Sequence, residues 1–326
     1  MKKILIIQTA FIGDVILATP LIEKLKRFYP DADIDFLLRK GNEGLLREHP
    51  KVHKVLIWDK DKSKYNALAK LGREVRRNNY DLLINLQRFA SSGLLTTSSG
   101  APEKIGFSKN PFSFAYTRKF PHVIDQEMHE VHRNLSLITH LTDEQFQKPV
   151  LYPSAGDYRK IVQYTQWPFI TISPASVWFT KQFPAEKWVE LIDGIKPDWR
   201  IYLLGAPSDL EACAAIKEKA AHTGVHLLAG ELNFLQSAAL MESARMNYAN
   251  DSAPLHMASA VNAPITAVYC STIPEFGFGP LSDDSRVVQT AEDLQCRPCG
   301  LHGKKSCPKG HFKCALTIDT AQMLPS

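Results

Sequence analysis

KILIIQTAFIGDVILATPLIEKLKRF, residues 3–28, joins a short apolar run directly to an amphipathic stretch. The run KILIIQ has the nearly continuous apolar character of a buried strand. After it, Val15, Leu21 and Leu25 recur at helical spacing and predict a helix from Asp14 to the end of the stretch. A buried strand followed by a helix is the first half of a β-α-β unit and predicts a parallel sheet.

The same alternation continues along the chain and restarts once. In the first half, further strands are predicted at 34–38, 54–58, 81–87 and 104–107, and helices at 65–78 and near 129–141. A linker is expected at 152–157, YPSAGD, which is rich in turn-forming residues. Beyond it, strands are predicted at 169–174, 200–205, 226–230, 245–250 and 264–270, with helices that begin at Glu186, Ser208, Phe234 and Pro254. We therefore expect an α/β protein of two doubly wound, Rossmann-like domains, residues 1–155 and 156–326, with the ligand site in the cleft between them.

The composition is that of a globular protein: 326 residues, of which 44% are hydrophobic and 22% charged. No apolar run approaches the roughly 20 residues that a membrane helix needs. Lys2 and Lys3 before an apolar run resemble the start of a signal peptide, but Gly13 and Asp14 interrupt that run, so we expect a cytoplasmic protein. The net charge of +5 permits an acidic partner, whereas the sequence lacks the aromatic and basic pattern of a nucleic-acid module.

Neither G-x-G-x-x-G nor G-x-x-x-x-G-K-[ST] occurs, so the usual nucleotide-binding fingerprints are absent from the sequence. Three other stretches carry candidate chemistry. The first is FIGD, residues 11–14, which follows the first strand. Asp14 is either the N-cap of the next helix or a general base, whose pKa the positive end of the helix would lower.

The second stretch is SPASVWFTKQFP, residues 173–184. Ser176 and Thr180 would supply hydroxyl donors, and Lys181 a cation, for a phosphate group. The alternative is an ordinary loop with an exposed lysine ahead of a helix.

The third stretch is NDSAPLHMASA, residues 250–260, in which a strand ends and a helix begins. The backbone amides of Ser252, Ala253 and Leu255 would then form a seat for a diphosphate. In the alternative, Ser252 only caps the helix and His256 packs against the sheet.

Together the three stretches resemble glycosyltransferase family 9, the ADP-heptose:lipopolysaccharide heptosyltransferases. The resemblance rests on FIGDVILATPL (11–21), WFTKQFPAEKWVELI (178–192) and NDSAPLHMASAVNAPITAVYCST (250–272), and is supported by KIGF (104–107) and GAPSD (205–209). It implies a GT-B fold whose N-terminal domain binds the acceptor sugar and whose C-terminal domain binds the nucleotide-sugar. It also implies transfer with inversion at the anomeric carbon and no cofactor required for catalysis.

The resemblance also implies roles for particular residues. The family's general base falls on Asp14, its diphosphate-binding lysine on Lys181, its ribose-binding acid on Asp209, its phosphate-binding turn on Asp251, Ser252 and Ala253, and its following histidine on His256. Ala253 stands where the family has glycine, so we expect a negative φ there and an extra methyl group beside the diphosphate.

The function that we expect is an inverting glycosyltransferase of lipopolysaccharide core biosynthesis. It would move a heptose from ADP-heptose to an acidic, lipid-anchored acceptor of the lipid A–core type, in peripheral contact with the inner face of the inner membrane. Candidate contacts to acidic groups of the acceptor are Arg73, Arg76, Arg77 and Arg88, unless they only form a solvated surface. One alternative is another nucleotide-sugar and a surface polysaccharide. A second is a metal-binding regulatory protein.

The second alternative depends on CRPCGLHGKKSCPKGHFKC, residues 296–314. Cys296, Cys299, Cys307 and Cys314 would supply four thiolates to a structural zinc ion, and His302 and His311 are substitute ligands. Free thiols and disulfides remain open as alternatives at this stage.

Overall fold

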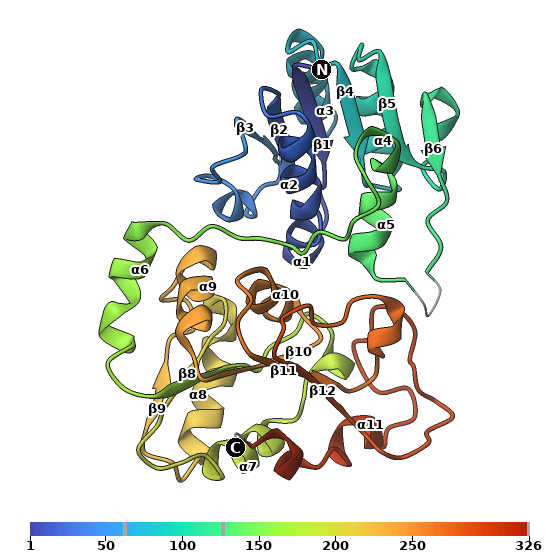
Figure 1. Cartoon of the computed structure of the whole chain (residues 1–326). Coiled ribbons are helices and arrows are strands. Elements are labelled where there is room, and N and C mark those ends of the chain that lie inside the picture. The colour runs from blue at the N-terminus through green and yellow to red at the C-terminus, as the bar shows by residue number, and fades with distance from the viewer. Residues whose placement is uncertain (61–63, 125–127, 325–326) are drawn as a thin grey trace. The chain divides into compact units, whose positions relative to one another are not determined.

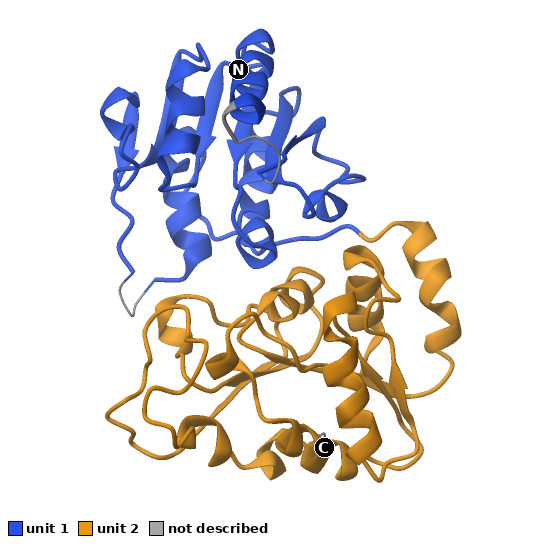
Figure 2. Cartoon of the chain, turned by 180° about the vertical axis from the view of Figure 1, so that it is seen from behind, with its two compact units in different colours: residues 1–152 blue, residues 153–326 orange. Residues whose placement is uncertain are grey.

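The computed structural model describes residues 1–60, 64–124 and 128–324. The chain divides into two compact units, unit 1 with residues Met1–Tyr152 and unit 2 with residues Pro153–Ser326 (Figure 2). Each unit has its own parallel sheet and its own buried core, so each is described by itself.

In the described part of unit 1, six parallel strands form a sheet of order β3-β2-β1-β4-β5-β6 (Figure 1). The strands are β1 (Lys3–Ile7), β2 (Asp33–Arg39), β3 (Lys54–Trp58), β4 (Leu82–Asn85), β5 (Glu103–Phe107) and β6 (Arg118–Phe120). The strand order reverses between β1 and β4, and at such a point a doubly wound sheet opens a crevice at the carboxyl ends of its strands.

Helices cover both faces of this sheet, which is why its central strands are apolar on both sides. The helices are α1 (Ile12–Ile16), α2 (Thr19–Phe28), α3 (Lys64–Arg77), α4 (Ala90–Ser98) and α5 (Glu130–Ser136). Helix α2 packs with α5, and α3 packs with α4.

The prediction of a single helix from Asp14 to Phe28 is wrong in one respect. The structure has two helices in this stretch, α1 and α2. The break lies before Pro20, which has no backbone N–H to donate to the carbonyl of Ile16. Thr19 Oγ1 donates to that carbonyl instead, at 2.8 Å.

Unit 2 repeats the plan in its described residues, with strand order β12-β11-β10-β7-β8-β9 and all strands parallel (Figure 1). The strands are β7 (Phe169–Ser173), β8 (Arg200–Leu203), β9 (Val225–Leu227), β10 (Met246–Asn250), β11 (Ile265–Tyr269) and β12 (Ser285–Gln289). Its order reverses between β7 and β10. The predicted fold class, two doubly wound Rossmann-like α/β domains, is therefore confirmed.

The helices of unit 2 again form two layers. They are α6 (Ala155–Ile161), α7 (Ala185–Asp193), α8 (Leu210–Lys219), α9 (Phe234–Ser243), α10 (Ala253–Ala260) and α11 (Lys313–Leu316). Helix α7 packs with α8, whereas α9 packs with α6 and α10 (Figure 1). None of the helices in the described part of the chain is both long and apolar enough to cross a membrane.

Helix α6 begins inside the stretch predicted to be a linker. Ser154 caps it: the Ser154 Oγ accepts from the Asp157 amide at 3.3 Å, and Asp157 Oδ2 accepts from the Ser154 amide at 2.8 Å. This is a capping box, in which each side chain satisfies an otherwise unpaired amide. The Ser-x-x-Asp spacing was therefore a helix signal as well as a turn signal.

Candidate functional site

Chemistry-bearing residues of unit 2 gather where β7, β10 and β11 end. These strands are neighbours in the sheet, and the strand order reverses between β7 and β10. The connections that follow them are residues 174–184, 251–252 and 270–273. A ligand that binds at a topological switch point would meet these connections first.

Lys181 and Asp251 form an ion pair at the carboxyl ends of these strands. Lys181 Nζ lies 2.7 Å from Asp251 Oδ2, and the two side chains are only 14% and 9% exposed. Thr272 Oγ1 donates to the same carboxylate oxygen, also at 2.7 Å. Asp251 thus holds the ammonium group of Lys181 in place. Because a lysine ammonium has three N–H donors, it can also donate to a phosphate oxygen.

Asn250, which the sequence analysis did not single out, holds the loop that carries Lys181. Its Nδ2 donates to the Pro174 carbonyl at 2.7 Å, and its Oδ1 accepts from the Phe183 amide at 2.9 Å. Asn250 is fully buried, so these bonds fix both ends of the loop to β10. The sequence signal for Asn250 was its position: it is the last residue of a strand and directly precedes Asp251.

Helix α10 begins at Ala253, one residue before the predicted start at Pro254, with Ser252 in extended conformation as its N-cap. Ala253 is not among the described residues with positive φ, which is as expected. The prediction for Leu255 is wrong: its amide donates to the Ser252 carbonyl at 3.1 Å and does not point toward a ligand. His256 is 95% buried in this helix, with 5% of its surface exposed.

Thr180 does not lie where the sequence analysis expected a phosphate donor. It is 1% exposed, and its Oγ1 accepts from Ser271 Oγ at 2.9 Å and from the Lys304 amide at 2.8 Å. Ser176 stays half-buried in the same loop, where its carbonyl accepts from Gln182 Nε2 at 2.6 Å. Thr180 is therefore a structural contact between two segments.

Asp209 lies after β8, the other neighbour of β7, in the short helical turn Pro207–Asp209. Its Oδ2 accepts from the Ala206 amide at 2.8 Å, and Ser208 Oγ lies 3.4 Å from its Oδ1. Asp209 therefore lies, like Lys181, at the carboxyl ends of the strands, and one of its carboxylate oxygens accepts from the Ala206 amide of its own turn.

In unit 1, Asp14 follows β1, at the edge where the strands end. It is the third residue of α1, and its Oδ2 accepts from the amide of the N-cap residue, Phe11, at 3.1 Å. Asp14 is therefore not the N-cap itself, which corrects one of the two interpretations. Its carboxylate instead satisfies the N-cap amide from within the first turn.

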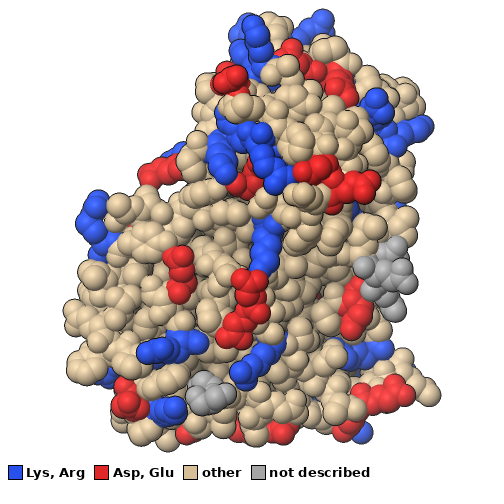
Figure 3. Space-filling view, viewed as in Figure 1, with Lys and Arg blue, Asp and Glu red and all other residues tan. Residues whose placement is uncertain are grey.

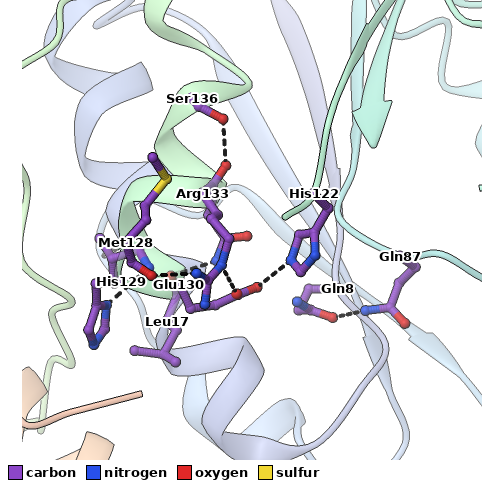
Figure 4. Close-up of polar contacts among 11 residues, drawn as sticks. Gln8, Leu17, Gln87, His122, Met128, His129, Glu130, Arg133 and Ser136 are labelled. Carbon is purple, nitrogen blue, oxygen red and sulfur yellow. Dashed lines mark hydrogen bonds and ion pairs between the residues drawn. The ribbon is translucent and has the colours of Figure 1, made fainter. Parts of the chain in front are cut away.

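Other polar groups occupy the same edge of unit 1. Gln8 and Gln87 follow β1 and β4, and Gln87 Nε2 donates to Gln8 Oε1 at the switch point (Figure 4). Lys60 follows β3, and its Nζ donates to the Thr9 carbonyl at 2.9 Å. Arg88 is exposed directly after Gln87.

A buried carboxylate, Glu130, lies nearby and was also missed. Arg133 Nε donates to Glu130 Oε2 at 2.7 Å, and His122 Nε2 lies 3.3 Å from Oε1 (Figure 4). Burial raises the pKa of Glu130, but the hydrogen bonds and charges of His122 and Arg133 outweigh burial and lower this pKa below its usual value. Asn134 Nδ2 donates to the Leu17 carbonyl at 3.1 Å, which ties α5 to the end of α1. The i, i+3 spacing of Glu130 and Arg133 was the available signal for their pair, whereas nothing in the local sequence pairs Glu130 with His122.

Arg73, Arg76 and Arg77 lie at the amino ends of the strands, opposite the carboxyl ends where Asp14 and Arg88 lie. All three are exposed near the end of α3, and the next residue, Asn78, accepts from Lys3 Nζ through its carbonyl at 3.4 Å. Lys3 begins β1, so this end of α3 lies where the strands start. The structure does not bring these arginines together with Asp14 or Arg88. On the face drawn in Figure 3, basic and acidic side chains are interspersed.

Cys296, Cys299, Cys307 and Cys314 are free thiols. Cys296 Sγ lies 3.8 Å from His311 Nε2, and burial raises the pKa of Cys314 to about 11. Among the residues that the structure describes, no group of three or more His, Cys, Asp or Glu side chains is arranged to hold a metal ion. The predicted zinc site therefore has no support in the structure.

Comparison with known proteins gives consistent matches. The family model of glycosyltransferase family 9 (heptosyltransferase) matches residues 68–309. The chain is similar to lipopolysaccharide heptosyltransferase 3 of Escherichia coli, with 29% identity over 80% of this chain and 82% of the relative.

Two solved structures show the same fold. One is the family 9 glycosyl transferase of Veillonella parvula, with a TM-score of 0.79, 22% identity and coverage of 88% of this chain and 85% of the other. The second is the ADP-heptose lipopolysaccharide heptosyltransferase II of E. coli, with a TM-score of 0.78, 24% identity and coverage of 92% and 96%. These likenesses support the GT-B fold.

Proposed function

Because the chain belongs to glycosyltransferase family 9, the heptosyltransferases, and is a glycosyltransferase of lipopolysaccharide biosynthesis, we propose that it moves a heptose from ADP-heptose to an acidic, lipid-anchored sugar. The acceptor would be of the lipid A–core type, met at the inner face of the inner membrane. The enzyme class sets aside the metal-binding regulator, and the proposal includes no zinc ion.

The observation that carries the proposal is the Lys181–Asp251 ion pair beside the start of α10. When the glycosidic bond to the diphosphate breaks, negative charge develops on the departing phosphate oxygens. A partly buried ammonium and the positive end of a helix stabilise that charge more in the transition state than in the ground state. Asp209, at the end of the adjacent strand β8, is the proposed ribose contact, and Ser176 lies in the loop that carries Lys181.

The proton of the acceptor hydroxyl also needs a destination as this oxygen attacks the anomeric carbon. We assign that role to the Asp14 carboxylate, at the carboxyl end of β1. One of its oxygens accepts from the Phe11 amide, which orients the group. Attack on the face opposite the diphosphate gives inversion, so a single general base is sufficient.

The position of the arginines makes Arg88, not Arg76, the proposed contact to acidic groups of the acceptor. Replacing Arg88 with alanine should raise the KM for the acceptor about three- to tenfold, a modest effect because the side chain is exposed. Arg76→Ala is the matched control and should leave this KM unchanged. Initial rates at two salt concentrations would test both, since screening weakens a charge contact. A larger effect of Arg76→Ala would contradict the assignment.

The identity of the donor is tested by calorimetric titration with ADP, UDP and GDP. We expect ADP to bind at least tenfold more tightly than the other two, and ADP-heptose to support transfer. A preference for UDP would instead favour the alternative, a glycosyltransferase that uses another nucleotide-sugar for a surface polysaccharide.

A further inference from the structure

The cysteine-rich segment, residues 296–314, packs directly against the loop that carries Lys181. The Thr180 amide donates to the Lys304 carbonyl at 3.1 Å, and the Lys304 amide donates to Thr180 Oγ1 at 2.8 Å. Two hydrogen bonds between one pair of residues fix distance and orientation together. The residue next to Thr180 is the lysine that we propose to bind the diphosphate.

Gly303 brings the backbone of the segment against Lys181 itself. A Cβ atom added to Gly303 would lie 2.8 Å from Lys181 Cγ and 3.1 Å from Thr180 Oγ1, and its φ is +74°. Real Cβ atoms do not approach other atoms so closely, so only glycine fits here without displacing the lysine stem. The centroid of the Phe312 ring lies 5.1 Å from that of the Phe179 ring, so a second residue of the segment also contacts this loop.

The segment is anchored at its start to the end of β11. Arg297 Nε donates to the Cys270 carbonyl and its guanidinium donates to the Thr272 carbonyl, both at 2.8 Å. The Cys299 amide donates to the Ser271 carbonyl at 2.9 Å. Thr272 is the residue whose hydroxyl binds Asp251, so residues 297–304 contact the supports of both partners in the ion pair.

From these contacts we propose that residues 297–304 form the back wall of the diphosphate site and position the Lys181 ammonium. The inference rests on the proposed donor site and adds to it: Gly303 and Thr180 are positioning residues, which act on the ligand through Lys181. It gives the cysteine-rich segment a role that does not depend on a metal ion. The wall fixes where the positive charge lies before the nucleotide arrives.

The test compares two glycines with the same backbone requirement. Gly303 and Gly310 have φ values of +74° and +71°, but a Cβ added to Gly310 meets no atom within 4 Å. Both Gly303→Ala and Gly310→Ala should lower the Tm, because both place alanine at positive φ, and Gly303→Ala should lower it further because its methyl group also clashes with the Lys181 stem. Only Gly303→Ala should weaken ADP binding in calorimetry, by about tenfold, since only there does the new methyl group displace Lys181.

Thr180 provides a second pair of variants. Thr180→Ser keeps the oxygen that accepts from Ser271 and Lys304 and should bind ADP like the wild type, whereas Thr180→Val should bind it more weakly. Lys181→Met completes the set. If Lys181→Met weakens ADP binding but Gly303→Ala and Thr180→Val do not, the back wall is overturned while the donor site stands. If wild-type protein fails to bind ADP, both proposals fall.

Discussion

Asp14→Asn is expected to lower kcat by about 10²–10⁴-fold, the usual contribution of a general base, while the affinity for ADP stays unchanged. The amide of asparagine cannot take the proton of the acceptor hydroxyl. Its carbonyl oxygen can still accept from the Phe11 amide, as Asp14 Oδ2 does at 3.1 Å, so α1 should keep its first turn. Nucleotide affinity is spared because the residues proposed to bind the diphosphate belong to unit 2.

A matched control is Asp59→Asn. Asp59 directly follows β3 and so lies, like Asp14, at the carboxyl ends of the strands. Asp59 Oδ2 pairs with Lys40 Nζ at 2.9 Å and has no role in the proposed reaction, so kcat should remain within about twofold of wild type. Single-turnover rates with saturating ADP-heptose would separate chemistry from product release. Near-native rates for Asp14→Asn would remove Asp14 from the mechanism and direct attention to His122, which Glu130 orients.

The sequence predicted every strand in the middle of each sheet, and of the edge strands only β3 and β9. β1 and β11 are buried along nearly their whole lengths, so each has a nearly continuous run of residues suited to the interior. The missed strands, β6 and β12, lie at sheet edges and have exposed residues, among them the Arg118 of β6. β6 and β12 each have only one neighbouring strand and lack an apolar run such as that of β3, so their sequences resemble those of loops.

Candidate site residues could be named from the sequence only one at a time, each from the stretch in which it lies. Lys181 and Asp251 could be named because each lies in a recognisable stretch after a strand, but only the structure shows that they form an ion pair. The prediction that Arg76 contacts the acceptor fails for a geometric reason. In a β-α-β unit the helix runs antiparallel to the strands, so its last turn lies beside the amino ends of the strands. Glu130 and His122 escaped notice because their contact depends on tertiary structure alone.

Lys181→Met should weaken ADP binding at least tenfold, since a charge-assisted contact to phosphate contributes about 1.5–3 kcal/mol. The same change should also lower the Tm. It leaves the Asp251 carboxylate, 9% exposed, with the Thr272 hydroxyl but without its cation, and removing one partner of a buried ion pair is destabilising. Lys187→Met is the control: its partner, Glu190, lies 2.9 Å away on the surface of α7, so neither ADP affinity nor Tm should change measurably.

Loss of affinity in Lys181→Met has two possible causes, a missing contact or a disturbed loop, and the double variant Lys181→Met/Asp251→Asn separates them. Asparagine carries no charge to be left unpaired, and its side-chain oxygen can still accept from Thr272 Oγ1. The double variant should therefore regain most of the lost Tm. ADP affinity should stay low, because the positive charge that meets the phosphate is still absent. If affinity returned together with stability, Lys181 would be only the partner of Asp251, and the leaving-group charge would have to be met by α10 alone.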